Sequence, residues 1–139
     1  MGLFDAIKAV LSKYATFSGR ARRAEYWWWA LTVSVIGIAL SFVDQMLFPT
    51  TAIKMIEGLA VEVPSMHPIF TSIFWLLTIV PTLAVTIRRL HDVDRSGWWL
   101  LIWFVPLIGW IVLLIWQVRA GTSFENRFGP DPIGASERV

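Results

Sequence analysis

Three long apolar runs, separated by polar segments, dominate the chain. They cover residues 26–48, 69–87 and 98–118. A helix rises about 1.5 Å per residue, so the first run would form a helix about 34 Å long. The hydrocarbon core of a bilayer is about 30 Å thick. Each run is therefore long enough to cross a bilayer, and the pattern predicts three transmembrane helices.

Residues 1–16 show a different pattern, with apolar side chains at helical spacing and polar side chains between them. An acid at Asp5 and the lack of an uninterrupted apolar core argue against a cleaved signal peptide. We therefore expect a short amphipathic helix on the membrane surface, with a polar tail of chance periodicity as the alternative. The apolar positions are Leu3, Phe4, Ile7, Val10, Leu11 and Tyr14.

A charged segment, RRLHDVDR, separates the second apolar run from the third and spans Arg88 to Arg95. One charged residue at the centre of a bilayer costs about 2.5–3.5 kcal/mol. Five such residues in one short segment would be too costly to bury in lipid unless they were paired. The segment is therefore expected at an aqueous surface.

The positions of the basic residues predict the orientation of the chain. Lysines and arginines near membrane segments prefer the cytoplasmic side. The segments on one predicted side contain eight of them, whereas the loop between the first two runs contains only Lys54. We therefore expect an inner-membrane protein with a cytoplasmic N-terminus. The eight residues are Lys8, Lys13, Arg20, Arg22, Arg23, Arg88, Arg89 and Arg95.

The third run allows two topologies. A full crossing would place the polar tail, residues 119–139, outside, whereas a re-entrant hairpin broken at VPLIG would place it inside. Non-helical backbone at membrane depth must be covered by protein, and a small chain offers little cover. Trp98 and Trp99 at one end and Trp116 at the other are typical of anchors at two interfaces. We therefore favour the full crossing.

Together these patterns predict an all-α integral membrane protein. Its parts would be an amphipathic helix over residues 1–16, a small bundle of three transmembrane helices within residues 17–118, and a polar tail over residues 119–139. The composition agrees, since 56% of the residues are hydrophobic and nine are tryptophan. The absence of cysteine excludes disulfides and thiolate metal sites.

Small residues and prolines in the runs indicate where helices pack or bend. Small side chains allow close approach of another helix, and proline inside a helix kinks it. Ordinary packing explains both features. A mobile helix pair that opens a path is the alternative, but the runs carry no ionisable residue at mid-membrane to support it. The residues are Ala30, Ser34, Gly37, Ser41, Pro81, Pro106 and Gly109.

Four motifs resemble a known family of bacterial inner-membrane proteins. They are FSGRARRAEYW (Phe17 to Trp27), RRLHDVDRSGWW (Arg88 to Trp99), PLIG (Pro106 to Gly109) and AGTSFENRFGPDP (Ala120 to Pro132). In order and spacing they resemble the family catalogued as domain of unknown function 805, the YhaH-like proteins. The resemblance implies a multi-pass bacterial inner-membrane protein and implies no activity.

The pair His91–Asp92 is the one hint of metal chemistry. Metal-dependent phosphohydrolases use such a pair together with several further histidines and carboxylates. Here the only other histidine is His67, which we expect at the opposite membrane face. We therefore expect no catalytic residue, no cofactor and no metal site, and no enzyme activity.

The charged residues can instead pair with one another. On a helix Arg88 and Asp92 are four residues apart and can pair directly, and Glu25 could pair with Arg88 or Arg89. Such a cluster could hold the helix ends together. It could also bind an anionic lipid headgroup or a cytoplasmic protein, because guanidinium groups bind phosphates in a bidentate way. The candidates are Arg20, Arg22, Arg23, Glu25, Arg88, Arg89, His91, Asp92 and Arg95.

These observations favour a non-enzymatic membrane scaffold or regulatory partner. Its arginine-rich cytoplasmic face would engage anionic lipid or another membrane protein, and no nucleic acid. The alternative is a small transporter or channel subunit, which would have to form a homo-oligomer because three helices can hardly enclose a pore.

Overall fold

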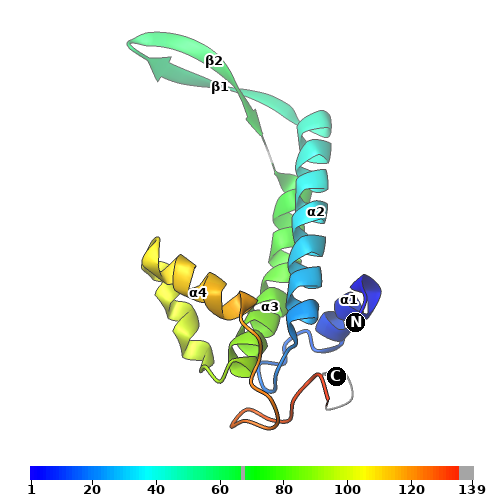
Figure 1. The fold of residues 1–139 in the computed structure, drawn as a ribbon. Helices are drawn as coiled ribbons and strands as arrows, with labels where there is room; N and C mark the ends of the chain where they lie inside the picture. Colours follow the sequence, from blue (N-terminus) through cyan, green and yellow to red (C-terminus); the bar gives the residue numbers. More distant parts are fainter. Residues whose placement is uncertain (67, 135–139) are drawn as a thin grey trace. The chain divides into compact units, whose positions relative to one another are not determined.

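The computed structural model describes residues 1–66 and 68–134 of the chain. It is mostly helical, with one small sheet (Figure 1). The helices are α1 (Leu3–Ser12), α2 (Arg23–Leu47), α3 (Ile69–Asp92) and α4 (Ile108–Val118), and η1 (Gly97–Phe104) is a 3-10 helix. The strands are β1 (Pro49–Ile56) and β2 (Leu59–Met66).

The chain divides into two compact units, and α2 and α3 each contribute to both. The first unit contains residues 1–31 and the chain from residue 80 onward, and the second contains residues 32–79. With 25 and 24 residues, α2 and α3 are both long and apolar enough to cross a membrane. Their positions agree with the first two predicted runs.

In the second unit, the end of α2 caps the start of α3. The buried carboxylate of Asp44 accepts hydrogen bonds from the backbone N–H groups of Phe70 and Thr71, each at 2.9 Å. These N–H groups have no partner within their own helix, so a carboxylate stabilises them. The aspartate near the end of the first apolar run therefore serves a structural contact.

The segment between α2 and α3, predicted as a loop, forms a two-stranded antiparallel sheet. Glu57 and Gly58 make the turn, with φ angles of 52° and 81°, and Ile56 pairs with Leu59 across it. Positive φ at both central residues is the geometry of the tight hairpin turn whose twist matches that of the strands. The expectation of an all-α protein is therefore wrong for this segment.

The third apolar run does not form one helix. It consists of η1 and α4, joined by a turn in which Leu107 has a φ of 65°. The rings of Trp103 and Trp110 lie 5.6 Å apart, and those of Trp99 and Trp116 lie 5.5 Å apart. Trp99 and Trp116 therefore lie at the same end of a helical hairpin, and the expectation of a third continuous spanning helix is wrong.

Gly109 explains how the two arms of this hairpin come together. A β-carbon at position 109 would lie far closer to the Ile102 carbonyl oxygen than van der Waals contact allows. Only glycine allows α4 to begin so close to the backbone of η1. The N–H of Val105 donates to the Ile102 carbonyl and the N–H of Gly109 to the Val105 carbonyl, each at 2.9 Å, so both carbonyls have partners beside Pro106.

The predicted packing residues are used in part. Gly37 is buried, and a β-carbon at this position would lie only 3.2 Å from the Trp75 ring of α3. Ser34 is exposed, while Ala30 and Ser41 are half-buried. The buried positions of α2 include Trp29 and Val33, so the packed face is rotated by about one residue from the predicted stripe of small residues.

Pro81 is buried inside α3, between threonines whose hydroxyls donate to backbone carbonyls of the same helix. The Thr86 hydroxyl donates to the Thr82 carbonyl at 2.6 Å. The Trp29 indole N–H of α2 donates to the Thr82 hydroxyl at 3.0 Å. The proline therefore lies at a point where the two helices are joined by a hydrogen bond.

The predicted N-terminal helix is present as α1. Its buried side chains are Ala6 and Val10, while Phe4 is 82% exposed. The apolar face therefore divides, with one part packed inside the first unit and Phe4 left on the surface. The location of α1 at a membrane surface stays a prediction.

Candidate functional site

Three segments that are distant in sequence meet around one carboxylate in the first unit. This carboxylate belongs to Asp92, at the end of α3. Its Oδ1 accepts a hydrogen bond from Arg20 Nε at 3.0 Å, and its Oδ2 forms an ion pair with Arg89. All three side chains are at least 99% buried. A buried carboxylate and two buried guanidinium groups require this mutual compensation, because an isolated charge there would be very costly.

A second buried ion pair lies beside this centre. Arg88 Nη1 is 2.6 Å from Glu25 Oε1, which joins the end of α3 to the start of α2. The predicted pairing of Glu25 with one of the two arginines is thereby confirmed. The predicted pairing of Arg88 with Asp92 is wrong, because the helix turns Arg89 rather than Arg88 toward Asp92.

The C-terminal tail is built onto the same centre. Arg20 donates to the carbonyl oxygens of Thr122 at 2.5 Å and Phe124 at 2.6 Å. The Thr122 N–H in turn donates to the Asp92 carbonyl at 2.8 Å. Arg89 donates to the carbonyl of Arg119 as well. Residues 119–129 therefore lie against the charged end of α3.

His91 takes part in this packing. His91 Nδ1 lies 2.9 Å from the Gly19 carbonyl oxygen. Because a carbonyl oxygen can only accept a hydrogen bond, Nδ1 carries the proton and donates it. The imidazole stacks on the Phe128 ring at 4.0 Å, and Asn126 donates to the His91 carbonyl at 2.9 Å. Within residues 1–66 and 68–134, no three His, Asp or Glu side chains are grouped to hold a metal. His67 lies outside the described residues.

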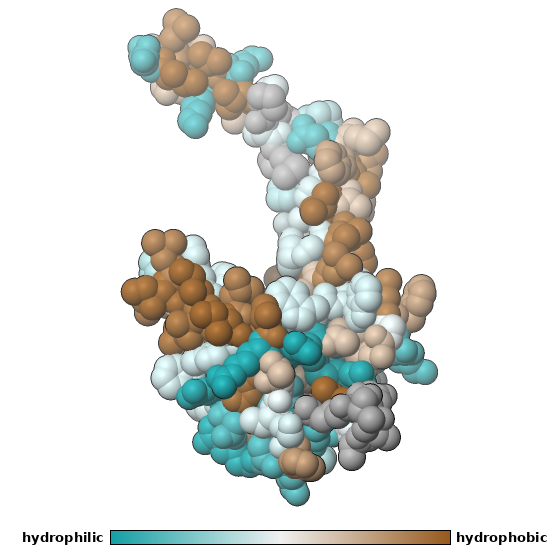
Figure 2. Space-filling model, viewed as in Figure 1, coloured by the Kyte–Doolittle hydropathy of each residue, from teal (hydrophilic) through white to brown (hydrophobic). Residues whose placement is uncertain are grey.

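The predicted charge cluster therefore separates into a buried part and an exposed part. Arg20, Arg88 and Arg89 are buried and held by protein groups. Arg23 and Arg95 are exposed, and Arg22 is half-buried. Arg23 donates to the carbonyl of Val118 at 3.3 Å. Figure 2 shows hydrophilic side chains gathered at this end of the first unit and hydrophobic side chains over α4.

A polar hollow of about 570 Å³ lies on the exposed side of the cluster. Three arginines line it, namely Arg95 after α3, Arg119 after α4, and Arg127 in the tail, together with Asp94. The sequence did not indicate this group. A full crossing of the third apolar run, which the sequence favours, predicts Arg119 and Arg127 on the opposite side of the membrane from Arg95.

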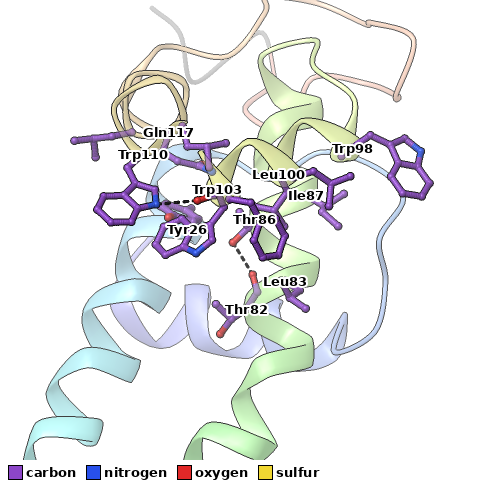
Figure 3. A pocket seen from close by; sticks show the side chains of 15 residues that line it. Tyr26, Thr82, Leu83, Thr86, Ile87, Trp98, Leu100, Trp103, Trp110 and Gln117 are labelled. Carbon is purple, nitrogen blue, oxygen red and sulfur yellow. Dashed lines mark hydrogen bonds between the residues drawn. The ribbon is translucent and has the colours of Figure 1, made fainter. Parts of the chain in front are cut away.

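A larger cavity of about 840 Å³ lies between the hairpin and the neighbouring parts of α2 and α3 (Figure 3). Its walls are mainly tryptophan, leucine and isoleucine, and include Trp103 and Trp110. The indole N–H of Trp110 donates to the backbone carbonyl of Trp103 at 2.9 Å. Thr82, Thr86 and Gln117 are polar residues of the wall. The cavity suits an apolar occupant.

Comparisons with known proteins agree with the membrane character of α2 and α3. The sequence model of a family described as protein of unknown function DUF805 matches residues 14–130. The chain is 43% identical to the inner membrane protein YhaH of Escherichia coli strain K12 over 123 residues, which cover 88% of this chain and 92% of that protein.

Two further relatives come from the same organism. The chain is 44% identical to the inner membrane protein YhaI over 124 residues, covering 89% of this chain and 92% of that protein. It is 30% identical to the uncharacterized protein YiiR over 145 aligned positions, covering 84% of this chain and 85% of that protein. No solved structure matches the chain.

Proposed function

This chain belongs to the DUF805 family, and on that premise we propose that it is a non-enzymatic scaffold or regulatory protein of the bacterial inner membrane. Its arginine-rich face would lie on the cytoplasmic side and engage anionic lipid headgroups. Two relatives that carry the name inner membrane protein support the location.

The observation that carries this proposal is that some arginines are buried in ion pairs whereas others are exposed. Arg20, Arg88 and Arg89 are neutralised in the interior and hold the ends of α2, α3 and the tail together. The exposed arginines around them include Arg95 and Arg119. They sit on a rigid support, so their positive charge can face an anionic surface without a large ordering cost.

The topology that fits this proposal has two crossings, by α2 and α3, and a re-entrant hairpin formed by η1 and α4. The tail is bonded to Arg20 and to the Asp92 carbonyl. It therefore lies on the same side as the end of α3. Backbone bonds at the hairpin turn give several of its non-helical groups a partner within the protein, which supports re-entry.

A transporter or channel subunit is less well supported. Such a protein needs a hydrated path with polar or ionisable groups at membrane depth. The cavity of the first unit is lined mainly by tryptophan, leucine and isoleucine side chains, which do not favour a path for water or ions.

The topology can be tested with single cysteines, because the natural chain has none. We expect an impermeant thiol reagent applied to intact spheroplasts to label Glu57→Cys. It should label Lys13→Cys and Glu125→Cys only after permeabilisation. All three residues are exposed, so labelling reports sidedness and not burial. Labelling of position 125 together with position 57 would mean a full third crossing. Labelling of positions 13 and 125 without position 57 would mean an inverted protein.

The lipid role can be tested by extracting the protein from native membranes into polymer nanodiscs and identifying its lipids by mass spectrometry. One arginine near an anionic surface contributes about 1 kcal/mol, or about fivefold in affinity. We therefore expect the ratio of anionic to zwitterionic lipid to be about fivefold higher than in the bulk membrane extract. Lipid proportions equal to the bulk extract would contradict the proposal. Lys54→Gln, on the opposite predicted side, is the control and should keep the enrichment.

A further inference from the structure

The polar hollow beside the buried charge centre has the composition of an anion site. Three arginines reach it from three separate segments, and Asp94 is the acid in its lining. The formal charge of these four side chains is three minus one, or +2. No other hollow described in the first unit brings arginines together in this way.

Each arginine of the hollow has a defined support. Arg127 donates through Nε to the Asp94 carboxylate at 3.1 Å and through Nη2 to the Asp94 backbone carbonyl at 3.0 Å. Its Nη1 is therefore left for another acceptor. The Arg95 guanidinium lies over the Trp116 ring at 5.1 Å. The carbonyl of Arg119 is bonded by the buried Arg89. The side chains of Arg95 and Arg127 and the backbone of Arg119 therefore have defined contacts.

The backbone wall of the hollow is also fixed. Gly121 lies so close to the buried Asp92 carboxylate that a β-carbon at this position would overlap its oxygens. The next residue, Thr122, donates its N–H to the Asp92 carbonyl at 2.8 Å. The hollow is thus formed by the same network that holds the tail, and its shape is set before any ligand enters.

We propose that this hollow binds a phosphate group through Arg95, Arg119 and Arg127. A phosphate monoester carries a charge of about −1.5 to −2 at pH 7, which matches the +2 of the lining. Guanidinium groups bind phosphate oxygens in a bidentate way, and this distinguishes the site from one that merely attracts negative charge.

The phosphate could be carried by a lipid headgroup or could be free in the cytoplasm. The hollow lies where η1 begins and α4 ends, which is the base of the hairpin proposed to be re-entrant. If the phosphate belongs to a lipid headgroup, the site rests on the proposed function, because it supplies the headgroup contact of that function. If the phosphate is free, the site does not depend on the proposed function.

Two binding measurements on the full-length protein in neutral detergent distinguish the sources. Calorimetry with inorganic phosphate reports the free form. Native mass spectrometry with added phosphatidic acid, against phosphatidylcholine, reports the lipid form. We expect the wild-type protein to bind the anion in at least one of these two measurements. Arg119→Gln should weaken that binding at least about tenfold, since a hydrogen bond to a charged group is lost. The affinity of Arg119→Lys should lie between those of the wild-type protein and Arg119→Gln.

Lys54→Gln removes the same charge from an exposed position in β1 and should bind like the wild-type protein. Arg95→Gln is a second test with different neighbours, in case Arg119→Gln fails to fold by its near-ultraviolet circular dichroism. No binding by the wild-type protein in either arm, or equal binding by the arginine variants, would overturn the proposal.

The outcomes also separate this site from the proposed function. Anionic lipid enrichment that persists unchanged in Arg119→Gln and Arg95→Gln, together with inorganic phosphate binding that is absent from the wild-type protein or equal in these variants, would reject the site and leave the lipid role standing. Arginine-dependent binding of inorganic phosphate without any anionic lipid enrichment would establish the site and reject the lipid role.

Discussion

Asp92→Asn is expected to destabilise the protein by about 3–5 kcal/mol, because it leaves buried guanidinium groups without a compensating charge. Asp92 is paired with both Arg20 and Arg89, and all three side chains are almost fully buried. The change keeps the size of the side chain, so the loss reports charge and hydrogen bonding. Thermal unfolding in detergent, followed by circular dichroism, measures the fall in melting temperature.

The matched control is Asp94→Asn, two residues further along. Its partner is Arg127, and both side chains are about half exposed, at 48% and 60%. An exposed pair contributes about 1 kcal/mol or less, so this variant should melt close to the wild-type protein. Equal melting temperatures for the two variants would show that the Asp92 centre is solvated. The account of a buried ionic junction would then fail.

Gly109→Ala is expected to open the hairpin formed by η1 and α4. The added β-carbon would overlap the Ile102 carbonyl oxygen, and the obstacle is backbone that cannot rotate away. Overpacking of this kind costs about 3 kcal/mol or more. The two arms would have to separate, and the contact between Trp103 and Trp110 would be lost.

Spin labels attached to cysteines at Leu101 and Ile115 can follow this change, since both side chains are more than half exposed. We expect a short, narrow distance distribution in the labelled parent and a longer, broader one after Gly109→Ala. Gly2→Ala is the control, because its β-carbon would meet nothing closer than 3.6 Å. A distribution unaffected by Gly109→Ala would show that the close approach at this glycine does not hold the hairpin together.

Local pattern in the sequence was enough to predict α1, α2 and α3. Helical spacing of apolar residues and run length depend on the residues within one element, so they can be recognised without knowledge of its neighbours. The same holds for the concentration of charge between Arg88 and Arg95, which the structure places at and beyond the end of α3. The pairing of Glu25 with a neighbouring arginine followed from their expected positions at adjoining helix ends.

Tertiary contacts decided the rest, and each case has a specific reason. Run length does not distinguish one spanning helix from two short arms, and the hairpin depends on contacts between η1 and α4 at Gly109. Helix spacing allowed Asp92 to pair with Arg88, but Arg20 and Arg89 occupy its carboxylate.

The arginine hollow illustrates the same limit most clearly. Arg95, Arg119 and Arg127 are spread over 33 positions of sequence, and no local period connects them. They meet because the hairpin returns the chain to its starting point and the buried Arg20–Asp92–Arg89 network then holds the tail. The sequence by itself determined which segments are helical and where charge gathers. Only the folded structure decided which charges are buried against each other and which remain exposed, because that choice depends on contacts between segments far apart in the chain.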